Sequence, residues 1–383
     1  MEALRSTVLI SVVTCFSIFL NEYLMSSHLI DFYKKGPIIM KPDPDYAGID
    51  YESIFYDYIK KISVTSDGTI FVSNTKQHNI SKFKDGRLIK TFSQKGEGPS
   101  DLYYPKLFGI LDDKYLIINQ HSLIGKVSVF DLDGAFVKLI KTTHNVWKIA
   151  PLTNNKLAIL ISTSIEDRHY SKTKYSILIK DFVTGKEKYA WSLTVNSKYK
   201  SSEIKLKSAF YRNKVYLLKI GNGNFLVGYS GDPNLSVYSP EGEKIRSFTV
   251  KYMKKKITGE MKKEFRKVME VHFQRSSFIK DVMKRVNWGE VFPEYTPYYC
   301  NIAVDSENNV LVFEHNGFEN VRERKFQVYD MKGMYQCESK IDFGEFKSSI
   351  DLQLIFANGN IYSLLNRRDT DDILLQFIKI KIK

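Results

Sequence analysis

The amino-acid sequence predicts an all-β fold, a six-bladed β-propeller of four-stranded blades with an α-helical insert between blades four and five. Three observations support this prediction. A pattern of strands and turns recurs six times, the chain is rich in Tyr and Phe, and the apolar period changes within one segment. The chain has 383 residues, of which 43% are hydrophobic, with 24 Tyr and 25 Phe. Aromatic and β-branched residues suit pleated, half-buried surfaces, so this composition favours strands.

Each repeat consists of an apolar strand, a turn with Asp, Asn or Gly, a second strand, a polar loop, and two further strands joined by a second turn. In the first repeat, from Ile59, the strands alternate with period two, and Asp-Gly pairs between such strands are hairpin signals. A unit of this kind cannot bury both faces alone, so the six units are expected to stack radially. The expected turns are Asp67-Gly68, Asp85-Gly86, Asp112-Asp113, Asp133-Gly134, Asn154-Asn155, Thr184-Gly185, Arg212-Asn213, Glu241-Gly242, Glu307 to Asn309, Lys332-Gly333 and Asn358-Gly359.

The last repeat, from Asp351 onward, lacks a segment for its outer strand. A propeller ring has to close, and an N-terminal strand can complete the final blade. Ile38 to Met40, or alternatively Ile49 to Tyr56, is expected to supply this strand. The propeller is accordingly expected to span residues 37–383.

The first 26 residues predict a signal peptide or an N-terminal anchor. After Arg5, Thr7 to Leu20 is a mostly apolar run of 14 residues without a formal charge. That length suits the core of a signal peptide better than a transmembrane helix, which needs about 20 residues. Cys15 follows a sequence that fits a lipoprotein box poorly, and a buried N-terminal helix is the remaining alternative. The protein is therefore expected to be exported, to the periplasm, to a membrane-anchored position in the envelope, or to the medium.

Residues 251–290 are expected to form a basic amphipathic helical insert, because apolar residues recur there at intervals of three and four. Between Lys251 and Arg285, twelve Lys and Arg stand against four Asp and Glu, a local +8 within a net charge of +14. Three interpretations remain, namely helices that cap one face of the propeller, a docking site for a partner, and a surface for an anionic membrane. Nucleic acid is disfavoured because no motif for it accompanies the charge. The membrane interpretation rests on Lys254, Lys255, Lys256, Lys262 and Lys263.

Several motifs resemble the NHL-like six-bladed propellers that bacteria export. DGTIFV, Asp67 to Val72, and VFDLDGAFVK, Val129 to Lys138, are similar to NHL repeat units. GEGPSDLYYPK, Gly96 to Lys106, is similar to the family's G-x-GPGEF-x-x-P linker, with Ser100 and Asp101 in place of Gly-Glu. Pro293 to Val312 is similar to the Pro-x-Tyr-x-Pro entry into a late blade. The resemblance implies the propeller fold but little about function, because propellers host binding and many chemistries.

The expected function is a binding or scaffolding module for a protein or small-molecule ligand, held on the face formed by the inter-blade loops. The alternative is a hydrolase or lyase with its site at the central channel, including a metal-dependent one. An enzyme of this kind is expected to show converging carboxylates or histidines with shifted pKa values. Histidines recur in loops after the second strand of a repeat, and the candidate ligand-binding residues are His78, His121, Trp147, Arg168, His169 and His315.

No catalytic residue and no metal ligand is predicted. The sequence contains no G-x-S-x-G, H-E-x-x-H or C-x-x-C motif. No cofactor is therefore expected, with calcium in the central channel as a minor alternative, since it needs about six oxygen ligands. Cys300 and Cys337 either pair in an oxidising compartment or remain buried free thiols.

Overall fold

The computed structural model describes a large part of the chain between residues 28 and 381. Among these residues, no helix has the length and apolar character needed to cross a bilayer. The predicted leader and Ile49 to Tyr56 lie outside them. The described residues are 28–41, 59–96, 98–120, 125–142, 144–166, 171–197, 213–264, 292–315, 322–344, 346–347, 353–367 and 375–381.

The described strands form six sheets, of which five have four strands and one has five. Four of the sheets follow the predicted repeat, because each is made of four consecutive antiparallel strands. Their strands are β2 (Ile59–Val64), β3 (Ile70–Asn74), β4 (Asn79–Lys84) and β5 (Arg87–Phe92); β6 (Pro105–Leu111), β7 (Tyr115–Gln120), β8 (Lys126–Asp131) and β9 (Phe136–Lys141); β10 (Asn145–Pro151), β11 (Lys156–Glu166), β12 (Ser171–Asp181) and β13 (Glu187–Ser197); and β14 (Val215–Ile220), β15 (Asn224–Tyr229), β16 (Asn234–Tyr238) and β17 (Lys244–Thr249).

The other two sheets depart from this plan. One contains β18 (Asn301–Val304), β19 (Val310–Phe313), β20 (Glu323–Tyr329) and β21 (Tyr335–Asp342), and β1 (Ile38–Ile39) adds a fifth strand outside β21. In the last sheet, β24 pairs with three strands. The strands of this sheet are β22 (Phe346–Lys347), β23 (Ile355–Ala357), β24 (Asn360–Arg367) and β25 (Leu375–Lys381).

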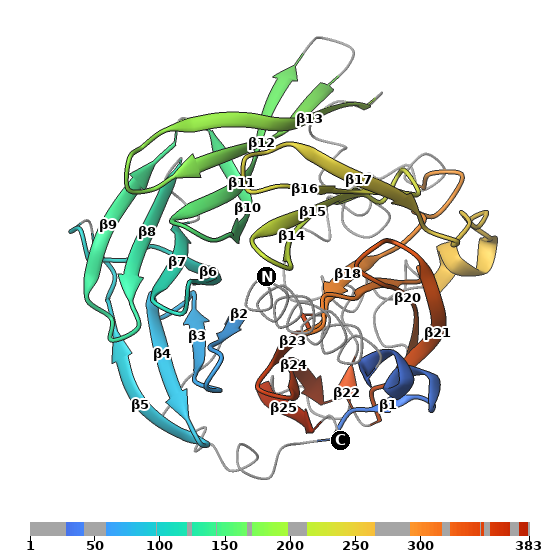
Figure 1. The fold of residues 1–383 in the computed structure, drawn as a ribbon, viewed down its shortest axis with the longest axis horizontal. Coiled ribbons are helices and arrows are strands. Elements are labelled where there is room, and N and C mark those ends of the chain that lie inside the picture. Colours follow the sequence, from blue (N-terminus) through green and yellow to red (C-terminus); the bar gives the residue numbers. More distant parts are fainter. Residues whose placement is uncertain are drawn as a thin grey trace, which may run out of the picture.

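The first strands of the sheets surround the middle of the molecule (Figure 1). They contact one another in the order β2, β6, β10, β14, β18, β23, and β23 also contacts β2. Gln353, just before β23, exchanges two hydrogen bonds with the backbone of Ile62 on β2, at 2.9 and 3.3 Å. The fold is therefore an all-β propeller with four-stranded blades.

Aspartate side chains organise the predicted turns. Oδ1 of Asp131 accepts from the backbone N–H groups of Asp133 and Ala135, at 2.9 and 2.7 Å. Oδ1 of Asp330 accepts in the same way from two N–H groups of the turn after β20, both at 2.8 Å. These carboxylates satisfy N–H groups that the strand ladder leaves unpaired, which explains why Asp recurs at this point of the repeat.

One predicted turn is wrong. Arg212-Asn213 was expected between the first two strands of the fourth repeat, but Asn213 precedes β14. The turn between β14 and β15 is instead formed by Gly221 to Gly223, and both glycines have positive φ. A glycine-rich turn needs no Asp-Gly pair, because glycine itself supplies the left-handed backbone.

The turn glycines also set the distance between neighbouring sheets. Gly333, after β20, has φ +81°, and a Cβ atom there would lie 2.6 Å from the ring of Phe248 at the end of β17. A Cβ atom added at Gly134 would likewise lie 2.5 Å from the ring of Phe92 in the preceding sheet. The recurrent Gly is therefore needed both for its backbone conformation and for the contact between adjacent blades.

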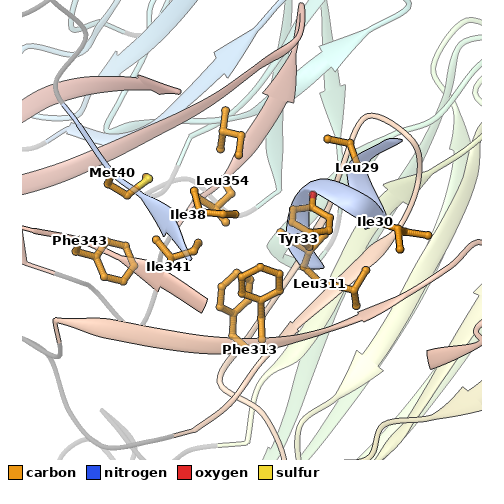
Figure 2. Packing of buried hydrophobic residues seen from close by; sticks show 14 of the residues in the cluster. Leu29, Ile30, Tyr33, Ile38, Met40, Leu311, Phe313, Ile341, Phe343 and Leu354 are labelled. Atoms are coloured by element: carbon orange, nitrogen blue, oxygen red, sulfur yellow. The ribbon is translucent and has the colours of Figure 1, made fainter. Parts of the chain in front are cut away.

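An N-terminal segment, residues 28–40, packs against the sheet of residues 301–342 (Figure 2). Residues 28–34 are helical and precede β1. Tyr33 is fully buried in this contact, and its ring meets the Phe326 ring edge to face at 5.6 Å. Figure 2 shows that the cluster also draws Leu354 from just before β23. The segment thus closes the core shared by the last two sheets.

The prediction that Ile38 to Met40 completes the last blade is wrong. β1 runs parallel to β21, with Ile38 opposite Ile341 and Ile39 opposite Asp342. Ile38 and Met40 are buried and Ile39 is exposed, so the segment has the alternation of a strand with one buried face. A strand with this alternation can pair with any open sheet edge that has apolar neighbours. In the structure it pairs with β21 and not with the last sheet.

The predicted helical insert is not shown by the structure. Within residues 251–290, only 259–264 are described as helical, and 265–290 lie outside the described residues. In Figure 1 this helical segment, drawn in yellow, lies at the periphery of the molecule near β17 and β20.

Asp305, which contacts the N-terminal segment, gives folding stability a pH dependence. Its Oδ2 accepts from the Tyr33 hydroxyl and from Nδ2 of Asn309, both at 2.9 Å. Burial raises the pKa of Asp305 from 3.8 to about 6, although these hydrogen bonds oppose the rise. Because the pKa of Asp305 is raised in the folded state, protonated Asp305 favours folding. This contribution to stability is complete below pH 3.8 and is lost as the pH rises through about 6.

We therefore expect the wild-type protein to lose up to about 3 kcal/mol of stability relative to Asp305→Asn between pH 4 and pH 7. Urea titrations of both proteins at a series of pH values measure this difference. A stability difference that stays constant, or that moves in favour of the wild type as the pH rises, would contradict the assignment.

Candidate ligand-binding face

The three predicted site residues that the structure describes, His78, Trp147 and His315, lie near strand ends on one face of the propeller. In each blade the first and second strands are antiparallel, so the second strand ends where the first begins. His78 lies between β3 and β4, His315 follows the end of β19, and Trp147 lies near the start of β10. His121, Arg168 and His169 lie outside the described residues. Ligand binding by these six residues stays a prediction.

His78 packs between blades. The side chain is buried, and its Nδ1 accepts from the backbone N–H of Tyr104 at 3.0 Å. Its ring lies 5.3 Å from the Tyr103 ring and 4.8 Å from the Tyr104 ring. Burial, together with the charge of Lys95, lowers the His78 pKa. A neutral imidazole held in this way fixes the connection between the first two sheets.

His315 is buried, and the residue before it, Glu314, accepts from a thiol through its backbone oxygen. Nη1 of the buried Arg324 lies 3.4 Å from Sγ of Cys300, and Sγ donates to the backbone oxygen of Glu314 at 3.2 Å. Burial raises the pKa of Cys300, so the group is a thiol at neutral pH. Of the two alternatives for Cys300 and Cys337, the structure shows free thiols, with Cys300 buried and Cys337 half-buried.

Trp147 has the exposure expected of a binding residue. Its side chain is 47% exposed, although it belongs to the innermost strand of its sheet. Nε1 donates to the hydroxyl of the buried Ser162 on β11, which fixes the orientation of the indole ring. A rigid, accessible aromatic surface loses little conformational entropy when a ligand covers it.

Trp147 stands at a β-bulge that recurs in three successive inner strands. The register of β10 against β11 shifts between Val146 and Lys148, so Trp147 is the extra residue. The same shift leaves Phe108 as the extra residue of β6 and Lys60 as that of β2. Bulges redirect side chains and are over-represented next to binding and active sites.

Lysines accompany the bulge aromatics. Nζ of Lys61 and Nζ of Lys106 lie 5.2 and 5.5 Å from the centre of the Phe108 ring. Nζ of Lys148, the residue after Trp147, lies 4.7 Å from the ring of Tyr216 on β14. The inner strands β2, β6 and β10 thus combine aromatic rings with three ammonium groups, and this combination is called the inner-strand site below.

The sequence did not single out Phe108, Lys61, Lys106 or Lys148. A lysine within an alternating strand is normally solvated, and a phenylalanine there is normally core. A register shift depends on the partner strand as well as on the strand itself, so no residue type within β6 or β10 marks it. The available signal was that an aromatic residue is followed by a glycine or a lysine at the same point of the second and third repeats.

A cavity of about 470 Å³ lies at the linker between the first two sheets. It is lined by Gly98 and Pro99 of the linker and by Lys126, Phe136 and Lys138 of β8 and β9. This volume falls within the range of small-molecule sites. The linker N–H of Gly98, however, donates to Oδ2 of Asp101 at 2.8 Å, so the glycines here hold a turn together.

Among the described residues, no group of three His, Cys, Asp or Glu side chains is placed to hold a metal ion. The aromatic and cationic groups on β2, β6 and β10 can bind a ligand through stacking and charge.

No protein-family model matches the chain, and no curated protein matches it. Among solved structures, a member of the DUF4221 family from Bacteroides vulgatus is similar, with a TM-score of 0.50 and 13% identity over 89% of this chain and 94% of that chain. Virginiamycin B lyase from Staphylococcus aureus is similar with a TM-score of 0.42 and 10% identity, covering 84% and 93%. The likeness to the DUF4221 structure shows the propeller fold alone, and the NHL-like resemblance stays a prediction.

Proposed function

We propose that this chain is an exported, NHL-like binding propeller whose ligand is a small planar organic anion held at the inner-strand site. The observation that carries the proposal is the repeated β-bulge, which leaves Phe108 beside Lys61 and Lys106, and Trp147 next in the chain to Lys148, whose ammonium group lies over Tyr216. A planar ligand stacks on the exposed indole, and its negative group pairs with the ammonium groups. Each interaction alone is weak, and together they select a flat, anionic molecule.

The proposal includes six blades in one closed ring. The cyclic contacts of the inner strands support this, and so do the hydrogen bonds between Gln353 and Ile62. A closed ring supports the inner-strand site, because β2, β6 and β10 then hold fixed positions relative to one another. Export rests on the apolar leader of the sequence.

A scaffolding role for a protein partner belongs to the same class of function and uses the same face. The alternative hydrolase or lyase stays a prediction, since His121, Arg168 and His169 lie outside the described residues. No observation on the described residues favours it over binding.

We expect Trp147→Ala to weaken binding of 2-naphthoate by at least about tenfold, the effect typical of a central aromatic contact. Isothermal titration of the purified chain with 2-naphthoate measures this change. Tyr189→Ala is the matched control, because Tyr189 is an exposed aromatic residue, 58% exposed, on the outer strand β13. Equal affinity of the Trp147 and Tyr189 variants would reject the inner-strand site.

A further inference from the structure

Residues 253–256, between the fourth and fifth sheets, form an exposed loop of one apolar and three cationic side chains. Met253 is 76% exposed, more than any other large hydrophobic residue described, and Lys254, Lys255 and Lys256 follow it. The flanking residues Tyr252 and Ile257 are buried. The four residues therefore project from two anchored ends.

The loop is held in place by a second segment. Lys256 forms an antiparallel bridge with Tyr295, and the N–H of Ile257 donates to the backbone oxygen of Glu294 at 3.0 Å. Lys255 N–H donates to the Thr296 hydroxyl at 3.0 Å, and Thr296 N–H returns a bond to the backbone oxygen of Lys255 at 2.8 Å. Because this pairing orders the loop, exposing Met253 is a fixed property of the fold.

Tyr295, which is 46% exposed, lies in the segment paired with this loop. Charge neutralisation around the loop is partial. Glu314 pairs with Lys255, and the neighbouring Glu294 raises the pKa of Tyr295. Within the described residues, Lys254 and Lys256 have no ion pair, and Nζ of Lys254 lies 4.9 Å from the Tyr298 ring. Two cations, a protruding methionine and an interfacial tyrosine thus occupy one surface.

We propose that residues 253–256 and Tyr295 dock this protein on an anionic lipid bilayer. Met253 enters the boundary between headgroups and acyl chains, Tyr295 occupies the headgroup level, and Lys254 and Lys256 pair with lipid phosphates. Lysine is a point charge without a demand for bidentate geometry, which suits a fluid layer of headgroups. An acidic protein partner would require shaped, specific pairing, for which the loop provides no pocket.

Vesicle flotation with the full chain tests this proposal. Lys254→Glu/Lys256→Glu is expected to reduce binding to vesicles of phosphatidylcholine and phosphatidylserine at least about tenfold, since each lysine near such a surface contributes roughly fivefold. Met253→Asp is expected to reduce the same binding. The matched control is Lys188→Glu/Lys244→Glu, which changes two exposed lysines on the outer strands β13 and β17.

Vesicles of phosphatidylcholine alone measure any binding by the apolar leader, which is the same in every variant. Equal binding to neutral and anionic vesicles, or unchanged binding of the Lys254/Lys256 variant, would overturn the proposal. Loop-dependent binding of polyglutamate, without binding to anionic vesicles, would also overturn the proposal, since that result indicates an acidic protein partner. Thermal melting of each variant checks that the fold is intact, and 2-naphthoate binding is expected to be unaffected.

Discussion

Replacing Tyr33 by alanine is expected to lower the free energy of unfolding by about 3–5 kcal/mol, as for other large buried aromatic residues. Tyr33 is among the largest fully buried side chains, and it joins the N-terminal segment to the sheet of residues 301–342. The substitution leaves a cavity beside Phe326 and removes the hydrogen bond to Asp305. Chemical denaturation measures the loss.

Two further substitutions separate the parts of this effect. Tyr33→Phe keeps the ring and removes only the hydroxyl, so we expect a loss of about 1 kcal/mol. Ile39→Ala changes a residue that is 51% exposed on the two-residue strand β1, and the expected loss is below about 1 kcal/mol. If Tyr33→Ala is no more costly than Ile39→Ala, the N-terminal segment is not part of the core.

Gly333→Ala is expected to destabilise the fold by about 2–5 kcal/mol, the sum of a left-handed backbone cost and overpacking. A methyl group there would overlap the ring and Cβ atom of Phe248 in the neighbouring sheet. Gly185→Ala is the matched control. Gly185 has a similar φ of +75°, but a Cβ atom added there would have no heavy atom within 4 Å.

The control is expected to lose only about 1–2 kcal/mol, the backbone cost alone. Thermal or chemical denaturation of both variants gives the difference. Equal losses at the two positions would show that Gly333 is required for its backbone angle only and that blades do not meet at this turn.

The strands and most of their turns followed from the sequence because their causes are local. Apolar runs bounded by turn residues define β6 and β8, and Asp131 and Gly134 mark the turn between β8 and β9. Pairing between distant segments has no such local cause. The alternation of Ile38, Ile39 and Met40 predicts a strand but does not select β21 over the edge of the last sheet.

Only part of the candidate site was predicted, because some of its residues depend on pairing with other strands. Trp147 was identified as an aromatic residue at a strand start, whereas Phe108 and Lys148 gain their significance from register shifts in two different sheets. His78 and His315 were identified from their recurrent loop positions, and both are buried. Sequence position indicated the loops, but the burial of His78 depends on Tyr103 and Tyr104, which belong to the linker after the first sheet.

The central claim is that a planar anion binds the inner-strand site, and the indole ¹⁵N–H resonance of Trp147 tests it most directly. Titration with 2-naphthoate is expected to shift this resonance progressively to saturation, because the indole N–H is fixed by Ser162 next to the ligand. The neutral isostere 2-naphthamide is expected to bind at least about tenfold more weakly, since it forgoes the lysine charges. An unmoved Trp147 resonance, or equal affinity for the acid and the amide, would contradict the claim.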